Sequence, residues 1–487
     1  MPYFPVLFSS PAAANVPSRL PFVGLVTALA LAAGAPLAAQ QRLSIPTPAP
    51  NSPFWGGVPS GPPSQQPLTL SLADALRRAL AYNLGVLIAE EVVDRADGAR
   101  RVALSELLPR LDGGVTETRQ KTNLEAFGFP LGPTFPRVVG PFNVFDARVS
   151  LRQAIFDARA TNELHAESHR LTAAQLSRRS ARDLIVLVSA NVYFQTVSTG
   201  ARAESTRAQL ETARALRQQA QELRAAGVTA GIDVIRSEAG VDAAQYAATE
   251  ARNDFEKSKL QLARLIGLPI RQTFTLVDQV PSLPVPTTGF EEVLARAYTD
   301  RPDFLAAQAR VRAAEAALSA ARAERLPSAA LVGDYGVIGL TVGSALSTFA
   351  VTGAVTVPLF DGGRASGRIR QAQSDLAQRQ AELEDLRASI YYNTRAAFLD
   401  LSAAEEQLQA ATRGRELANL ALTQARDRFA AGVTNTVEVV QAQQAVAAAS
   451  ERFIAAQYDV TVATALVLSS PGSLEQAIAQ FLGSPLP

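Results

Sequence analysis

The sequence predicts a mainly α-helical protein with a small β part, built as a duplicated helical hairpin. Two stretches, 142–268 and 359–470, contain no proline, although the 487-residue chain has 29. Because proline breaks helix interiors, runs of this length leave room for very long helices. The chain also repeats itself in order over most of its length, and each copy carries two short stretches with β-strand character.

The composition excludes several classes of protein. The absence of cysteine excludes a disulfide framework, a thiolate zinc site and a cysteine nucleophile. The formal net charge of +1 gives no electrostatic footprint for nucleic acid. His165 and His169 lie four residues apart in a helical pattern, but no third metal ligand is evident. With no visible nucleophile and base pair, the sequence predicts no enzyme, no cofactor and no metal site.

The N-terminal part is expected to direct export. Residues 1–39 read as a signal peptide, with a positive start at Arg19, an apolar run over 22–34 and small residues for cleavage at 37–39. A membrane anchor is the alternative, but a glycine and a proline interrupt the apolar run. Residues 40–67 form a Pro-rich linker that we expect to be extended or disordered. No later apolar run approaches ~18 residues, so no transmembrane helix is expected.

The internal repeat aligns in three blocks. Residues 71–109 match the segment that lies 218 positions later, Ile155–Asp157 match the segment 204 positions later, and the stretch around Gly227 matches the segment 205 positions later. Three aligned blocks in the same order indicate a duplication. The drop from 218 to 204 means that the first copy carries fourteen extra residues between Pro109 and Ile155.

Each repeat is expected to contain a short amphipathic helix, an Ala-rich helix, two strands, a long helix, a tip and a returning helix. In the first repeat, 70–268, the expected elements are 72–82, 84–108, 111–119, 144–155, 158–226, 227–231 and 232–266. In the second repeat, 289–470, they are 290–299, 303–326, 328–337, 348–359, 364–431, 432–436 and 437–468. The Gly, Pro and Phe content of 121–142 predicts a loop between the first two strands. Residues 269–288 connect the repeats, and 471–487 form a C-terminal tail.

The four strands have the length to cross an outer membrane when tilted. One chain with four strands cannot close a barrel, because the smallest barrels have about eight, and an open edge in lipid leaves backbone groups unsatisfied. A barrel would therefore be shared between chains. Two copies would supply eight strands and three would supply twelve, and both numbers are physically allowed. The helices taken alone are also compatible with an ordinary long bundle.

Several motifs resemble the signature of the TolC-like outer membrane efflux proteins, the outer membrane factors of tripartite efflux and type I secretion systems. They are Pro358–Arg364, directly after a strand, then Arg301–Asp303 with an Ala-rich helix that ends at Leu326–Ser328, and two Gly-Val-Thr tips. The resemblance covers about residues 70–470, although the first-copy segment Phe156–Arg159 lacks both glycines. It implies a homotrimer with an α-helical tunnel in the periplasm and a shared twelve-stranded β-barrel in the outer membrane.

The resemblance also implies a function. The chain would be a channel-tunnel that passively conducts substrates from the periplasm or an inner-membrane transporter to the exterior, docked on a periplasmic adaptor. Drugs, metals and proteins all remain open as cargo. The alternative is a periplasmic coiled-coil adaptor or a scaffold without a pore. An adaptor would have one hairpin flanked by β-rich domains, whereas this chain has two hairpins, each preceded by a strand pair.

Two structural sites are expected from the motifs. The strand-to-helix turn consists of Phe360, Asp361, Gly362, Gly363 and Arg364. Its aspartate can cap the helix, and its glycines permit a turn that is closed to bulkier residues. A phosphate-binding loop would need a Lys-Ser/Thr pair, which is missing. The adaptor would dock on the tips, formed by Gly227, Val228, Thr229, Gly432, Val433 and Thr434.

The resemblance places a periplasmic gate at the same tips. Asp233 matches a latch residue and Glu438 a pore-ring acid. Phe429, Thr434 and Gln441 stand where the family has a latch Tyr, an Arg and a second ring acid. Because neither a phenyl ring nor a threonine can replace those polar partners, we expect the usual latch to be absent or replaced. Alternatively, the two acids simply favour the first turns of the returning helices.

Overall fold

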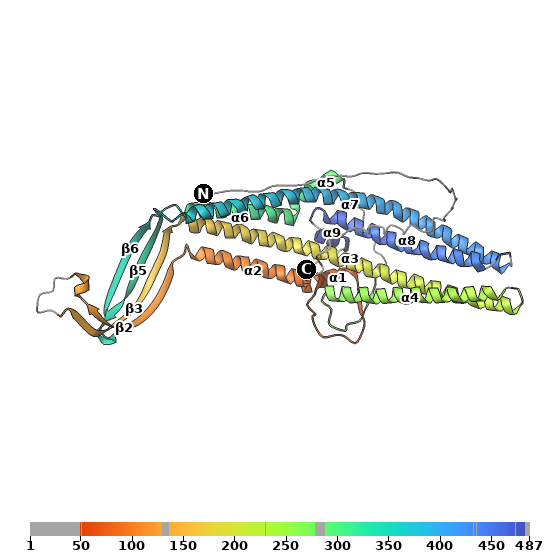
Figure 1. Cartoon of the computed structure of the whole chain (residues 1–487), viewed down its shortest axis with the longest axis horizontal. Helices are drawn as coiled ribbons and strands as arrows, with labels where there is room; N and C mark the ends of the chain where they lie inside the picture. The colour runs from red at the N-terminus through yellow and green to blue at the C-terminus, as the bar shows by residue number, and fades with distance from the viewer. Residues whose placement is uncertain are drawn as a thin grey trace, which may run out of the picture. The chain divides into compact units, whose positions relative to one another are not determined.

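The computed structural model describes most of the chain, namely residues 49, 51–128, 136–228, 230–277, 288–431, 433–434, 436–472 and 474–482 (Figure 1). The predicted signal peptide, 1–39, lies outside these residues, as do Thr229 and Gly432 of the predicted tips. The described part belongs to one compact unit, Leu43–Pro487. It is mainly helical with a small β part, which confirms the predicted class.

The two repeats fold into the same succession of elements. The first repeat consists of α1 (Leu72–Tyr82), α2 (Leu84–Ser105), β2 (Arg110–Asn123), β3 (Val138–Phe156), α3 (Ala158–Ala225) and α4 (Gly231–Leu265). The second repeat consists of α5 (Phe290–Asp300), α6 (Pro302–Ala323), β5 (Ser328–Gly339), β6 (Leu346–Thr356), α7 (Arg364–Ala430) and α8 (Thr436–Ser469). Helices α1 and α2 begin and end 218 positions before α5 and α6, which is the offset that aligns their sequences. The duplication is therefore present in the fold.

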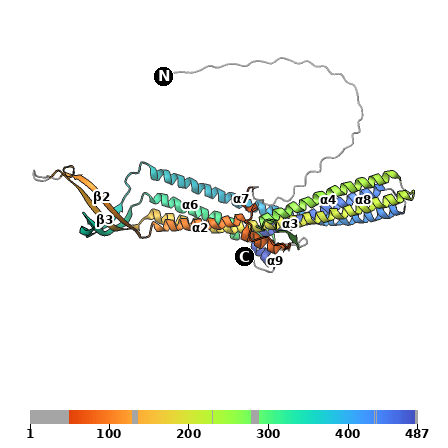
Figure 2. The ribbon, with the colours of Figure 1, turned by 90° about the horizontal axis from the view of Figure 1, so that it is seen from below.

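Two shorter helices pack along each long helix, one after the other. Helices α2 and α4 pack on successive parts of α3, and α6 and α8 do the same on α7 (Figures 1 and 2). Helix α3 also contacts α6 and α8. The two repeats therefore lie side by side, with the strands at one end of the long helices and the helical tips at the other.

The Ala-rich helices end one turn earlier than expected, at Ser105 and Ala323 instead of 108 and 326. The N–H groups of Leu107 and Leu108 bond to carbonyls three residues back instead of four. The cause is the proline that follows, since the residue before a proline is pushed out of the α region. The last turn tightens to satisfy its backbone groups.

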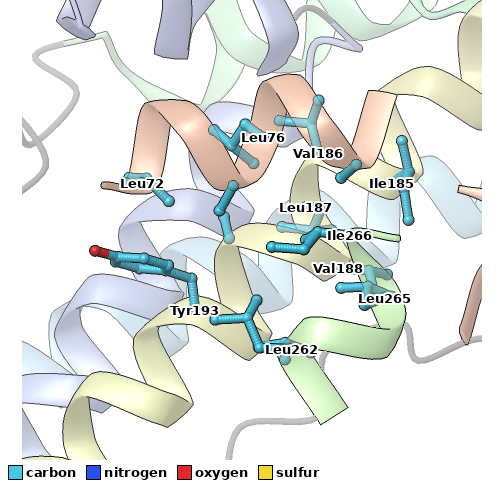
Figure 3. Packing of buried hydrophobic residues seen from close by; sticks show 14 of the residues in the cluster. Leu72, Leu76, Ile185, Val186, Leu187, Val188, Tyr193, Leu262, Leu265 and Ile266 are labelled. Atoms are coloured by element: carbon cyan, nitrogen blue, oxygen red, sulfur yellow. The ribbon is translucent and has the colours of Figure 1, made fainter. Parts of the chain in front are cut away.

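The main apolar core surrounds the middle of α3. The stretch Ile185–Val188 and Tyr193 pack against Leu72 and Leu76 of α1, while Leu262 at the end of α4 closes the other side (Figure 3). Contrary to the expectation that no later apolar run would approach the length of a membrane span, α3 contains an 18-residue stretch that is apolar enough to cross a membrane by length and composition. Some 56% of that stretch is buried inside the structure, so packing accounts for its apolar character.

The linker expected over 40–67 is not wholly extended in its described part. Pro53–Trp55 form a 3-10 helix, η1, and the rings of Phe54 and Trp55 pack against the main core. A Cβ atom at Gly85 would lie 2.3 Å from Cδ1 of Phe54, so the ring fills the space that this glycine leaves open. The expectation was wrong here because two aromatic residues supply apolar surface within a segment whose average composition suggests none.

The connection and the tail also contain elements that the sequence did not reveal. In the connection 269–288, Phe274–Leu276 form strand β4, which pairs in parallel with β1 (Leu68–Leu70). Residues 278–287 lie outside the described part. In the tail, helix α9 (Leu474–Leu482) buries Leu474 and Ile478 in the main core.

The remaining strands form one four-stranded antiparallel sheet in the order β2-β3-β5-β6, so β2 and β6 are its edges. The loop expected over 121–142 is wrong at both ends, because β2 continues to Asn123 and β3 begins at Val138; residues 129–135 lie outside the described part. Much of the extra length of the first repeat goes into this hairpin, whose strands have 14 and 19 residues against 12 and 11 in the second. Strand β6 ends at Thr356 instead of 359, because the chain leaves the sheet before the proline-containing turn.

Candidate functional site

The turn between β6 and α7 is capped by Asp361. Its Oδ2 atom accepts a hydrogen bond from the backbone N–H of Ala365 at 2.7 Å, and its Oδ1 atom accepts one from Gly363 at 2.9 Å. Both bonds lower the pKa of the Asp361 carboxyl because they stabilise its charged form, and the bond from Ala365 has the larger effect. Gly362 and Gly363 have φ values of 65° and 90°, in the left-handed region that favours glycine. Asp361 therefore caps the start of α7, and Gly362 and Gly363 adopt the backbone conformation that the sequence predicts.

The first repeat makes the same crossing without glycine. Strand β3 runs to Phe156, and Asp157 caps α3 through a hydrogen bond of 2.8 Å from the N–H of Ala160. In the second repeat seven residues separate the end of β6 from the start of α7, and Leu359 and Phe360 are almost fully exposed. The missing glycines of Phe156–Arg159 thus reflect a tighter connection.

The two faces of the sheet differ in chemistry. Large apolar side chains on one face are exposed, including Leu111, Val115, Tyr335, Phe349, Val351 and Val355. On the other face, β3 and β5 carry the charged residues Asp146, Arg148 and Asp334, and Arg148 contacts both aspartates. An exposed apolar face on strands of this length is typical of a sheet that faces lipid.

The helical tips of the two repeats use the same backbone turn. The N–H of Val228 donates to the carbonyl of Leu223 at 2.9 Å, and the N–H of Val433 donates to the carbonyl of Arg428 at 2.9 Å. Both bonds span five residues, a pattern that is common at helix ends, and in the first tip the intervening Gly227 has a left-handed φ of 76°. The side chains of Val228 and Val433 are 63% and 69% exposed, so each tip presents an apolar side chain to its surroundings.

A buried hydrogen bond joins the two returning helices near the tips. The hydroxyl of Thr436 on α8 donates to Oδ1 of Asp233 on α4, and the two residues are 0% and 8% exposed. Arg236 lies 3.6 Å from the same oxygen. Thr436 was not among the residues predicted from the sequence. The sequence did contain a signal, because the duplication aligns Thr436 with Gly231 and the hydroxyl therefore occurs in the second repeat only.

Glu438 lies apart from that bond and has its own partners. The hydroxyl of Thr434 donates to Oε2 of Glu438, and Nη1 of Arg428 lies 3.4 Å from Oε1. Glu438 and Asp233 both occupy the first turn of their helices, where an acid suits the helix dipole. Gln441, one turn further along α8, is exposed.

Phe429, at the position where the family resemblance has a latch Tyr, is buried. It is 3% exposed and belongs to an apolar cluster formed by Leu216 of α3, Leu422 and Ala425 of α7 and Val439 of α8. Helices of both repeats thus meet in this cluster. The structure brings Phe429 into the contact between the hairpins, Asp233 into a bond with Thr436, and Thr434 beside Glu438.

Metal sites find no support in the described residues, where no group of three or more His, Asp and Glu side chains is placed to hold an ion. His165 and His169 therefore gain no third ligand among the residues that the structure describes.

Known proteins resemble both the sequence and the fold. A family model described as outer membrane efflux protein matches residues 75–268 and 293–470. The outer membrane efflux protein BepC of Brucella suis is 25% identical over 426 residues, which cover 84% of this chain and 87% of BepC. The pyoverdine export outer membrane protein OpmQ of Pseudomonas putida is 27% identical over 301 residues, covering 58% of this chain and 60% of OpmQ.

Among solved structures, the Campylobacter jejuni CmeC outer membrane channel shares the fold with a TM-score of 0.75 at 17% identity, covering 91% of this chain and 97% of CmeC. The family match takes in both repeats, including the strands, the long helices and the tips described above. The chain therefore belongs to the outer membrane efflux protein family, and it is an efflux channel of the outer membrane whose helical tunnel lies in the periplasm.

Proposed function

We propose that three copies of this chain assemble into one passive conduit, with a shared twelve-stranded barrel in the outer membrane. The observation that carries the proposal is the open four-stranded sheet. All eleven residues of β6 are exposed, and so are nearly all residues of β2, the other edge. In lipid, unpaired edges would leave backbone groups without partners, so other chains must pair with them. Three copies supply twelve strands and a lumen, whereas two would supply eight strands and little space.

We further propose two partners for this conduit. An inner-membrane transporter drives export, and a periplasmic adaptor connects the transporter to the helical tips. The exposed Val228 and Val433 side chains offer that adaptor two apolar contacts per chain, on tips of the same backbone form. The relatives named for efflux and export support a tripartite assembly of this kind.

The gate is proposed to close through apolar packing and one buried hydrogen bond. The cluster around Phe429 and the bond from Thr436 to Asp233 both hold the second hairpin against the first. Opening the tunnel would separate these contacts. Three copies of Glu438 would form a charged ring at the constriction, weakened by the neighbouring Arg428.

The cargo is proposed to be small. The Arg301–Asp303 and Pro358–Arg364 segments favour small-molecule efflux over protein secretion. In a passive channel, the partner transporter chooses which small molecules are exported.

Cross-linking between edge strands tests the assembly. The natural chain contains no cysteine, so introduced cysteines are the only thiols. We expect the double variants Val115→Cys/Val351→Cys and Val115→Cys/Val355→Cys, purified from outer membranes, to give covalent ladders that stop at three chains with a short thiol cross-linker. Each single variant is the matched control and should stay monomeric on a denaturing gel. A ladder ending at two chains would contradict the trimer, and the absence of any ladder would contradict the shared barrel.

A further inference from the structure

A cluster of three charged side chains bridges the two repeats on the polar face of the sheet. The guanidinium of Arg148 on β3 binds Asp146 through its Nε atom at 2.7 Å and through Nη2 at 2.5 Å. Its Nη1 atom lies 3.1 Å from Oδ2 of Asp334 on β5. Strands β3 and β5 belong to different repeats, so this cluster lies at the seam between them.

Two glycines make room for this arrangement. Arg148 pairs with Gly114 on β2 and with Gly336 on β5, so neither neighbouring strand places a side chain beside it. A Cβ atom at Gly336 would lie 2.4 Å from the Cβ atom of Arg148. The guanidinium can therefore reach sideways to Asp334, and all three charged side chains are only partly exposed, at 34% or less.

The pleat of the strands places the cluster on the face opposite the exposed apolar side chains. Asp146 and Arg148 alternate along β3 with Ala147 and Val149, and Val149 is exposed on the apolar face. When the apolar face meets lipid, the cluster faces the lumen of the proposed barrel. This step rests on the proposed function.

We propose that Arg148 sets the ion preference of the barrel lumen by offsetting one of the two carboxylates that it binds. With Arg148 present, the cluster carries one net negative charge per chain. At the adjoining level, towards the helices, Arg110 is bound to Asp112 at 3.0 Å and Arg152 adds one positive charge. These six side chains sum to zero charge per chain, so this part of the barrel lumen favours ions of neither sign.

Charge variants separate this electrostatic role from a structural one. Arg148→Gln leaves two negative charges in the cluster, Asp334→Asn leaves none, and the double variant restores the natural value of one. Arg119→Gln is the matched control, because Arg119 lies on the same sheet but alternates onto the other face, opposite Asn143. Asparagine keeps the shape of aspartate, so Asp334→Asn tests the proposal even where Arg148→Gln folds poorly.

The measurement is the reversal potential of single channels in planar bilayers under a potassium chloride gradient. We expect Arg148→Gln to raise the potassium-to-chloride permeability ratio by roughly twofold or more and Asp334→Asn to lower it, because a charged ring favours ions of opposite sign. The double variant should return to the wild-type ratio, and Arg119→Gln should not depart from it.

A wild-type protein that forms no channels would contradict the proposed conduit and this inference with it. Channels whose ratio is the same in wild type, Arg148→Gln and Asp334→Asn would contradict the inference alone. So would a double variant that departs from wild type further than either single variant, since that outcome indicates damage to the sheet.

Discussion

The carboxylate of Asp183 on α3 accepts a hydrogen bond of 3.4 Å from the backbone N–H of Glu475 in the first turn of α9. The neighbouring Arg182 binds the side chain of Glu475 at 2.7 Å. Burial, together with the negative charges of Glu475 and Asp303, raises the pKa of Asp183 to about 7, against the lowering effect of the N–H bond. A titratable group thus lies where the C-terminal helix meets the core.

The first prediction concerns the pH dependence of this contact. Because the pKa of Asp183 is higher in the folded state than its ordinary value of 3.8, its stabilising contribution is fully present below pH 3.8 and is lost as the pH rises through about 7. We expect α9 to be cleaved faster by an added protease at pH 8 than at pH 5.5, relative to an unstructured peptide substrate. Asp183→Asn, which keeps the acceptor, should remove the difference. An unchanged pH dependence in that variant would rule Asp183 out as its source.

The second prediction concerns the turn before α7. Gly363→Ala should destabilise the protein by about 1 kcal/mol, since a side chain in the left-handed region is strained even where space is open. Gly367→Ala, inside α7 and also in open space, should stabilise it by up to about 1 kcal/mol, because alanine is the better helix former. Thermal unfolding in detergent measures both. If both substitutions change the stability equally, the left-handed backbone at position 363 imposes no energetic cost on alanine.

The third prediction concerns the contact between the hairpins. Thr436→Val removes the hydroxyl and leaves the buried Asp233 without that donor, and Phe429→Ala opens a cavity in the apolar cluster. Both variants should raise the mean single-channel conductance by favouring separated hairpins. Thr436→Ser keeps the hydroxyl and should behave as wild type. If Thr436→Val conducts no more than Thr436→Ser, the hydrogen bond does not hold the gate.

The fourth prediction concerns Glu438 and Arg428. Glu438→Ala should lower cation selectivity and weaken block by divalent cations, whereas Arg428→Ala should strengthen both, because it frees the carboxylate from its neighbour. Single-channel recordings with divalent ions added on the periplasmic side make the comparison. Should Glu438→Ala leave both properties unaltered, the acid serves only the first turn of α8.

Much of the fold could be predicted because its signals are local or repeated. The proline-free stretches mark α3 and α7, and the duplication fixes the order of the elements in each repeat. Asp361 could be assigned a capping role because its partners, Gly363 and Ala365, lie within four residues of it.

The features that escaped prediction depend on contacts between distant segments. The ring of Phe54 packs where Gly85 leaves space, and α9 folds against a core that the tail alone does not reveal. The bond from Thr436 to Asp233 spans 203 residues. Likewise, the glycines beside Arg148 come from β2 and β5, and only the strand register shows that they are its neighbours.

The unequal lengths of the two strand hairpins have a consequence for the cell surface. In the proposed trimer, three longer β2-β3 hairpins alternate with three shorter β5-β6 hairpins around the mouth of the pore. The outer rim of the barrel is then uneven, because three hairpins extend further from the membrane than the three between them. Large particles that approach from outside then meet the far ends of β2 and β3 before those of β5 and β6, because β3 pairs with β5 only from Phe145 onward.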